Sequence, residues 1–510
     1  MPAETIDLRR PVEQRRDRAI EAARRSFEDT LLWLTDATAP KRLHEVDDGL
    51  WRRLMRLGVL LVGVWLVHQL PDEVPAVLRR GGAWYGEVTL SHDWVRSRFG
   101  EVGFMRPVYR LVHGHGDLKV SPMDRQIGLA AGRMSLAVHL QTAWLCARMA
   151  YDQAVEVLGG LSGYAPSKRA ALGVVAGLGP QAMSFLMDLP VPEDDGDILV
   201  IQVDGKGAPM ISSREHQRRC RPHAKRPRGM TRRGLRRWRR QRWDRRRRKS
   251  GPSKNAKMAT FAVIYTLRRL SDGSLEGPLN KRVLGTFRGM NALFAMAQVE
   301  ARKRGYGQKR TVFLADGALA LWSHQERYFP LATPCLDWYH LSEYLWTAGG
   351  TVHPEGSDAL RDWVRCRQAQ LRKGDVDGVL SALQALTAVI DGSGTDGRLK
   401  RLAACIRYVE NHRHLLPYRE LLAEGLDIAT GAVEGAVKHV AGVRLDGSGM
   451  HWGTAGAESV LALRCVLING DWPAFADRVA KTHEVVDAWT VPRVTLTKKA
   501  VPHDAVRKAA

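Results

Sequence analysis

Residues 198–205 read Ile-Leu-Val-Ile-Gln-Val-Asp-Gly, an apolar run of strand length that ends in an acid followed by glycine. Residues 311–317 repeat the arrangement as Thr-Val-Phe-Leu-Ala-Asp-Gly. Short β-branched runs that end at glycine are typical of buried strands. We therefore expect Asp204 and Asp316 where two neighbouring strands end. Aspartate before glycine is also a common turn former, and the chain holds 54 Asp and Glu, so these two acids alone do not specify a site.

The sequence around these two runs alternates between strand and helix patterns. Apolar periodicity predicts further strands at about 258–267, 282–288 and 333–337 and helices at 291–304 and 318–328. Three strands, a helix and a strand that ends in an acid resemble the order of the ribonuclease H-like fold. We predict an α/β core of this class over residues 191–475. A mostly helical stretch at about 342–428 interrupts it.

The first 190 residues read mainly as helices. Periodic spacing predicts helices over 19–33, 50–70 and 126–149, with a small β segment at 84–111. A helix over 151–161, a turn containing Gly163 and Pro166, and a second helix from 167 make a helix-turn-helix pattern, although an ordinary helical hairpin fits equally well. Lys168 and Arg169 would begin its second helix, where such proteins contact DNA. We divide this part into a helical region at 1–120 and a DNA-binding region at 121–190, and we assign 476–510 to a C-terminal tail.

The net charge of +24 is concentrated in one segment. Residues 214–249 hold 19 Lys and Arg and two acids, a net charge of +17. A basic run with interleaved tryptophans favours nucleic acid, because arginines neutralise phosphates and tryptophans stack on bases; the alternative is a solvated loop. We predict a basic insert at 213–256 whose DNA contacts are Arg236, Arg237, Trp238, Arg239, Arg240, Arg242, Trp243, Arg245, Arg246, Arg247 and Arg248.

A third acid stands late in the chain. Residues 431–434 read Gly-Ala-Val-Glu, and residues 444–452 read Arg-Leu-Asp-Gly-Ser-Gly-Met-His-Trp. We expect Glu434 on a helix that begins near Thr430, a suitable N-cap. Two strand-end aspartates and a helical glutamate can hold two Mg²⁺ or Mn²⁺ ions, the chemistry of phosphodiester cleavage. Glu458 is the rival acid, although it opens the next helix and can simply favour that N-terminus.

These segments, together with Ser121-Pro-Met-Asp124 and Asp337-Trp-Tyr-His340, resemble bacterial insertion-sequence transposases of the ISKra type, which are related to Mutator-like transposases. The resemblance covers roughly residues 85–475. It implies a DDE transposase whose catalytic acids are Asp204, Asp316 and Glu434, with an all-helical insertion before the glutamate.

The resemblance also implies partners and further site residues. His340 would lie near the active site, oriented by Asp337, although a buried core histidine is an equally open reading. Lys438, Arg444 and Trp452 are candidate DNA contacts; a surface ion pair for Lys438 and core packing for Trp452 are the alternatives. The expected partners are double-stranded DNA (the element's terminal inverted repeats and the target) and further copies of the chain, in a homodimer or larger assembly.

The remaining composition fits a bacterial cytoplasmic protein at the nucleoid. The six cysteines are scattered and form no CxxC pair, and residues 1–25 are charged and lack an apolar signal segment. We expect no membrane span. Three alternatives stay open: a ribonuclease H-like nuclease without strand transfer, a domesticated DNA-binding protein without catalysis, and an RNA-binding protein that binds through the arginine-rich segment.

Overall fold

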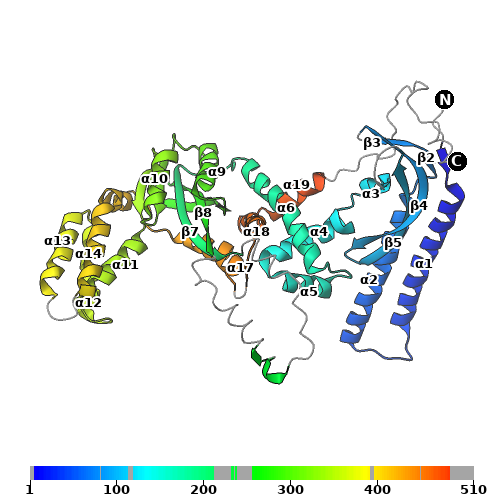
Figure 1. Ribbon diagram of the computed structural model, residues 1–510, viewed down its shortest axis with the longest axis horizontal. Helices are drawn as coiled ribbons and strands as arrows, with labels where there is room; N and C mark the ends of the chain where they lie inside the picture. Colours follow the sequence, from blue (N-terminus) through cyan, green and yellow to red (C-terminus); the bar gives the residue numbers. More distant parts are fainter. Residues whose placement is uncertain are drawn as a thin grey trace. The chain divides into compact units, whose positions relative to one another are not determined.

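The computed structural model describes residues 5–80, 82–112, 119–211, 231–234, 236–237, 256–390, 396–447 and 450–482. The chain divides into two compact units (Figure 1). The first comprises Met1–Gly177 with Pro473–Ala510, and the second is Leu178–Trp472.

A five-stranded sheet forms the centre of the second unit, with the strand order β11-β10-β7-β8-β9. The strands are β7 (Ile198–Pro209), β8 (Ala256–Arg269), β9 (Leu275–Thr286), β10 (Arg310–Ala315) and β11 (Thr333–Leu336). Strand β10 is parallel to β7 and β11, whereas β8 is antiparallel to β7 and β9. The expected strands are all present. Strand β7 differs from the prediction because it continues past Asp204 to Pro209, where it pairs only with β8.

Helices cover this sheet because they bury one apolar face. They are α9 (Met290–Lys303), α10 (Leu319–Tyr328), α16 (Gly431–Val437) and α18 (Thr454–Ile468). In α9 the buried residues Leu293, Phe294, Ala297 and Ala301 recur at helical spacing. Phe294 packs within 5.9 Å of Phe313 from β10, measured between ring centroids. The mixed α/β core expected for residues 191–475 is confirmed at this level.

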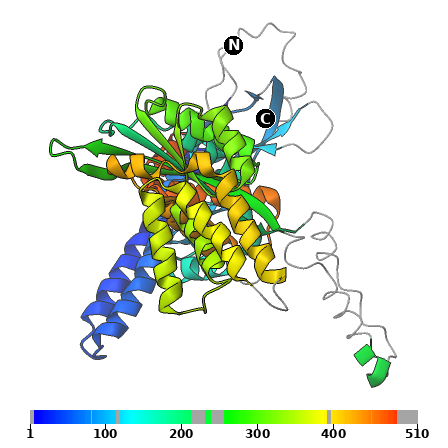
Figure 2. The same ribbon diagram turned by 90° about the vertical axis from the view of Figure 1, so that its left-hand side faces the viewer.

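The predicted helical stretch forms a group of helices after β11. Its members are α11 (Trp338–Gly349), α12 (Asp358–Arg372), α13 (Val376–Val389), α14 (Asp396–Asn411), η3 (Arg413–Leu415) and α15 (Tyr418–Ala423). The helices α11, α12, α13 and α14 lie side by side as a bundle (Figures 1 and 2). Asp337, Ser357 and Asp375 cap three of them by accepting hydrogen bonds from first-turn amides.

The last part of the second unit returns to the sheet. Helix α16 continues through a π-helical turn, η4 (Lys438–Gly442), into α17 (Val443–Leu445). Trp452 then extends the end of β7: its N–H donates to the Pro209 carbonyl, and its carbonyl accepts from Ile211.

Helix α19 (Trp472–Lys481) crosses the predicted start of the tail at 476 and buries Phe475 and Val479, so any tail begins after this helix.

The first unit combines a helical hairpin with a second sheet. The hairpin consists of α1 (Arg9–Thr35) and α2 (Leu43–His68). The strands are β1 (Thr5–Asp7), β2 (Glu73–Pro75), β3 (Leu78–Arg80), β4 (Ala83–Ser97), β5 (Gly100–Leu111) and β6 (Lys119–Val120). Strands β1 and β2 pair with each other, and the remaining four form a sheet in the order β3-β4-β5-β6. Its core joins Val12 of α1 and Leu66 of α2 to Val95, Val102 and Phe104 of the sheet.

The region from 121 to 188 contains α3 (Pro122–Gln126), η1 (Ala131–Arg133), α4 (Leu136–Arg148), α5 (Tyr151–Leu161) and α6 (Lys168–Asp188). The prediction of one helix over 126–149 is wrong. Gly128 and Gly132 adopt φ values of 62° and 73°, which a continuous right-handed helix does not allow. The α5 prediction and the start of the second helix near 167 are confirmed.

Helix α6 is long and apolar enough to cross a membrane, judged by length and composition alone. However, Ala182, Phe185 and Leu186 on this helix are buried, and Gly179 lies against Ser459 of α18. This pattern is that of a core helix in a globular unit.

Candidate active site

The two strand-end aspartates lie at the same edge of the five-stranded sheet. The register of the parallel pair β7 and β10 aligns Val203 with Ala315, so Asp204 and Asp316 follow at neighbouring positions. The Asp204 carboxylate accepts from the Gly205 N–H at 2.6 Å, and the Asp316 carboxylate accepts from the Ala318 N–H at 2.9 Å. These bonds to the local backbone hold both side chains close to the chain.

Glu434 reaches this edge because a buried glutamine fixes the start of its helix. Gln202, 1% exposed in the middle of β7, accepts from the Val433 N–H at 2.9 Å and donates to the Ala429 carbonyl at 3.2 Å. Thr430 occupies the N-cap position as expected, but its hydroxyl donates to the Glu434 carboxylate at 3.1 Å instead of capping the helix. Glu434 therefore projects from the first turn of α16, beside the strand that carries Asp204.

Asp337 hydrogen-bonds to the N-terminal ends of two helices, α11 and α16. It is fully buried at the N-cap of α11. One carboxylate oxygen accepts from the Thr430 N–H at 2.7 Å, and the other accepts from the N–H and Nδ1 of His340 at 2.8 and 2.9 Å. Asp337 thus orients His340, as the resemblance implied, and also positions the segment that leads to Glu434.

The side chains at this sheet edge influence one another electrostatically. Burial raises the pKa of Asp204 above its ordinary value; the Gly205 N–H opposes this, and the charges of Asp316 and Glu434 raise it further. His340 is 41% exposed at its side chain. The hydrogen bond to Asp337, with the charge of Asp316, raises the pKa of His340 to about 9 against the opposing effect of burial. With 41% of its side chain exposed, His340 is hydrogen-bonded but is not the buried core histidine of the alternative.

A compact group of ligand atoms lies here. The ligand atoms of Asp337, His340 and Glu434 all lie within 4.8 Å of one another, and theirs is the one such group of His, Cys, Asp or Glu among the described residues. Both oxygens of Asp337 are already used in hydrogen bonds. Glu434 belongs to this group and keeps an exposed carboxylate, whereas Asp204 and Asp316, the other two acids expected to hold a cation, are not among its members.

The helical insertion holds the loop that carries Asp316. His412 Nε2 lies 3.0 Å from the Gly317 carbonyl, and a Cβ atom on Gly317 would lie 2.2 Å from the Tyr408 hydroxyl. Tyr408 stacks on Tyr344 of α11 with ring centroids 3.7 Å apart. The residue after Asp316 must therefore be glycine for α14 to pack so closely.

Glu458, the alternative candidate for the third acid, has a different role. Glu458, on α18, accepts from the Thr286 hydroxyl and the Phe287 N–H, both at 2.6 Å. These bonds anchor the end of β9 to α18. Because its carboxylate is satisfied there, Glu458 is a structural residue, and the choice of Glu434 is favoured.

Two predicted DNA contacts are corrected. Arg444 is 1% exposed and lies over the Trp452 ring at 4.7 Å, and Trp452 is 7% exposed and donates from Nε1 to the Leu445 carbonyl. Both pack in the core, because the segment around Trp452 adds to the end of β7. Lys438 is exposed, and no ion pair joins it to Glu434 within the described chain. Among exposed cations near this end of β7, Lys206 pairs with Asp446 at 3.5 Å.

The structure places part of the expected DNA-binding set. Lys168 and Arg169 begin α6 and are exposed, and Lys168 pairs with Asp152 of α5 at 3.0 Å. Arg236 and Arg237 are exposed in a short helical segment. The other predicted contacts of the basic insert, from Trp238 to Arg248, lie outside the described residues.

Sequence reasoning missed Gln202. The available signal was a single polar residue inside an otherwise apolar strand, since a buried amide needs hydrogen-bond partners. Its partners, Ala429 and Val433, stand more than 220 residues away in the sequence.

No family model matches the chain, and no curated protein matches it closely in sequence. The transposase resemblance therefore rests on the quoted motifs and on the site itself.

Proposed function

We propose that the chain is a DDE transposase that cleaves and joins DNA strands at its three acids. The observation that carries the proposal is that Asp204, Asp316 and Glu434 meet at one sheet edge, although 118 residues, with seven helical segments among those described, separate the last two. Support for a ribonuclease H-like core comes from the strand order. Numbered by their order in the sequence, the five strands lie across the sheet as 3-2-1-4-5. Strands 1, 2 and 3 are antiparallel to their neighbours in that run, and strands 4 and 5 are parallel to strand 1.

The donor set fits Mg²⁺ or Mn²⁺. These ions prefer carboxylate oxygens. The pKa of Asp204 is raised first by burial and then by the negative charges of Asp316 and Glu434, and a bound cation would relieve that repulsion. Asp204, Asp316 and Glu434 would hold two such ions. The chemistry a bound pair supplies is activation of a water or 3′-hydroxyl and stabilisation of the leaving oxygen.

Other residues of the chain position the acids for this chemistry. Gln202 and Asp337 fix the start of α16. The fold itself therefore sets the position of Glu434 relative to the aspartates, and no conformational ordering of Glu434 has to precede the reaction. His340, held cationic by Asp337, adds a positive charge beside three carboxylates and lowers the repulsion that an incoming phosphate would meet.

DNA binding follows from charge. The basic insert supplies a sequence-independent grip on phosphates, while the exposed Lys168 and Arg169 at the start of α6 would read the terminal inverted repeats. Lys438 lies close to Glu434 and would contact a phosphate near the site. We place the protein in the bacterial cytoplasm, bound to DNA, as a homodimer or larger assembly that brings two ends together.

The test uses purified chain and labelled DNA from the element's ends with their flanks, with and without Mg²⁺. We expect metal-dependent nicking at the end, followed by joining to a second duplex, and loss of both in Asp316→Asn. Asp446→Asn, which changes an acid outside the site, serves as the control. Cleavage without joining would support a nuclease instead, and binding without cleavage would support a DNA-binding protein that does no chemistry.

A further inference from the structure

The hairpin of α1 and α2 exposes apolar side chains along both helices. On α1 they are Ile20, Phe27, Leu31 and Leu34, and on α2 they are Trp51, Leu54, Leu61 and Trp65. Each is between 40% and 53% exposed. Leu32 of α1 and Leu43 of α2 are exposed still further, at 68% and 84%. Scattered exposed leucines are normal, but ten large apolar side chains on one two-helix element are not.

The spacing of these residues is that of a coiled-coil seam. They follow one another on α1 at intervals of seven, four and three, and on α2 at three, seven and four. Intervals of three and four place side chains on one stripe of a helix. Each helix thus has two apolar stripes, one of which faces the other helix of the hairpin.

The two exposed stripes lie on the same side of the hairpin. In α1 the stripe lies about 80° further round the helix than Ala23 and Thr30, which are buried toward α2. In α2 it lies about 120° further round than Gly49 and Arg53, which meet Trp33 of α1. The two helices are antiparallel. A stripe that is displaced in the same rotational sense from the helix–helix contact on each helix therefore lies on the same side of the hairpin. The other side of α2 is occupied, because Val59 and Val62 pack against the sheet core.

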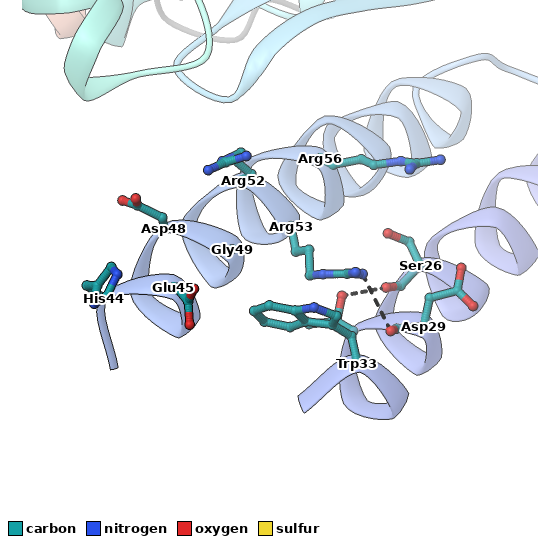
Figure 3. A pocket seen from close by; sticks show the side chains of 11 residues that line it. Ser26, Asp29, Trp33, His44, Glu45, Asp48, Gly49, Arg52, Arg53 and Arg56 are labelled. Atoms are coloured by element: carbon teal, nitrogen blue, oxygen red, sulfur yellow. Dashed lines mark hydrogen bonds between the residues drawn. The ribbon is translucent and has the colours of Figure 1, made fainter. Parts of the chain in front are cut away.

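The tip of the hairpin is fixed. The Arg53 guanidinium lies 4.6 Å from the Trp33 ring centroid, and the ring fits against Gly49, where a Cβ atom would lie 2.4 Å from it (Figure 3). A hollow lined by side chains of both helices opens beside Trp33. The exposed face is therefore carried by a rigid element and loses little conformational freedom on binding.

We propose that this face is an interface between two copies of the chain. Helices of 27 and 26 residues are about 40 Å long. Two such helices about 10 Å apart present on the order of 800 Å², the area that each partner of a stable interface contributes. Two hairpins placed face to face by a two-fold axis form a four-helix bundle with both stripes buried.

The chemistry of the face selects this occupant over DNA. The stripe positions are apolar except for Arg24 on α1 and Gly58 on α2, against which Phe99 packs, whereas Arg15, Arg18 and Arg25 point to the other sides of α1 by helical spacing. Phosphate binding needs cations at the contact, and a heptad seam needs a partner seam. The inference does not depend on catalysis and holds whether or not the chain cleaves DNA.

The test measures the mass of the full-length chain without DNA or metal. Nuclease-treated protein is studied by analytical ultracentrifugation over about 1–50 µM, in about 0.5 M NaCl to screen charge-driven association. The variant Phe27→Glu with Leu54→Glu is compared with wild type. The matched control is Leu331→Glu with Val389→Glu, which changes two apolar residues of the other unit that are even more exposed than Phe27 and Leu54.

We expect wild type and control to have twice the mass of one 56.9 kDa chain. The hairpin variant should be monomeric, with a dissociation constant raised at least about 100-fold and an unchanged circular dichroism spectrum. If that variant unfolds, Leu31→Lys with Leu61→Lys replaces it. A monomeric wild type, a hairpin variant that stays dimeric, or a control that dissociates equally would each overturn the proposal.

Discussion

The N–H of Val433 donates to the side-chain oxygen of Gln202 at 2.9 Å, which attaches the helix of Glu434 to the strand of Asp204. A single amide in the sheet therefore sets the distance between two of the three acids. This relation leads to our first prediction, that the catalytic geometry depends on a residue that takes no part in the chemistry.

Gln202→Leu should destabilise the protein and lower its activity together. The leucine leaves the Val433 N–H and the Ala429 carbonyl without their buried partner, which costs about 1–3 kcal/mol of unfolding free energy. Urea unfolding and DNA nicking measure the two effects. Tyr265→Phe is the control, because it removes only the hydroxyl that lies 3.3 Å from the Gln202 amide. Equal activity in wild type and Gln202→Leu would refute the positioning role.

The contribution of His340 to stability should depend on pH. Its folded pKa of about 9 lies above its ordinary value of 6.5. The stabilisation is therefore complete below pH 6.5 and is lost as the pH rises through 9. It should be small, because the side chain is 41% exposed and solvent screens the pair with Asp337. Unfolding of wild type and His340→Gln at pH 6 and pH 10 compares the two; a His340→Gln protein that loses as much stability as wild type between these values would contradict this assignment.

The sequence predicted the strands of this site better than its connections. Apolar runs that end at Asp204 and Asp316 follow from local pattern, and both strands formed in the expected neighbourhood. The burial of Arg444 and Trp452 could not be predicted in this way. It depends on the pairing of Trp452 with Pro209 and Ile211, some 240 residues away, and local periodicity carries no information about such a contact.

The two candidate glutamates should fail in different ways. Glu434→Gln should lower the nicking rate at least about 100-fold with little change in unfolding, since its carboxylate is exposed and accepts a hydrogen bond from the Thr430 hydroxyl. Glu458→Gln should weaken the anchor of β9 and cost about 1–2 kcal/mol of unfolding free energy while much of the activity remains. Rates and urea midpoints measured on both variants decide the matter. The reverse pattern would show that Glu458 is the catalytic acid.

A buried ion pair before β7 should matter more than its exposed neighbour. Arg304 is 0% exposed at its side chain and makes two hydrogen bonds to Asp195, at 3.1 and 2.6 Å. Asp195→Ala leaves this guanidinium buried and unpaired, which should cost about 3–5 kcal/mol. Asp194→Ala is the control: its side chain is 82% exposed and pairs with Arg268, so its loss should cost less than about 1 kcal/mol.

The ion pair between Arg304 and Asp195 should also make the free energy of unfolding fall at acidic pH. Burial favours the protonated form of Asp195, but hydrogen bonds from Arg304, Thr266 and Asn280 outweigh it and hold the pKa below its ordinary value of 3.8. The stabilisation is present above pH 4 and is lost as the pH falls through the folded pKa. Wild type should therefore lose more unfolding free energy than Asp195→Asn between pH 5 and pH 2. Equal losses would mean that the pair does not control acid unfolding.

Removal of residues 214–249 should weaken DNA binding broadly and reduce its salt dependence. The segment carries 19 of the 78 Lys and Arg, and each phosphate neutralised contributes about −0.9 to the slope of log K against log salt. A deletion that removes several such contacts flattens the slope by several units and affects specific and random DNA alike. Lys168→Ala with Arg169→Ala should instead weaken binding to the element's ends more than to random DNA, because these residues begin α6, the second helix of the proposed helix-turn-helix. Titrations at several salt concentrations on both DNAs separate the two effects. An unchanged slope after the deletion would mean that the insert does not grip the backbone, and the affinity of the chain for DNA would then have to come from the exposed cations of its folded units.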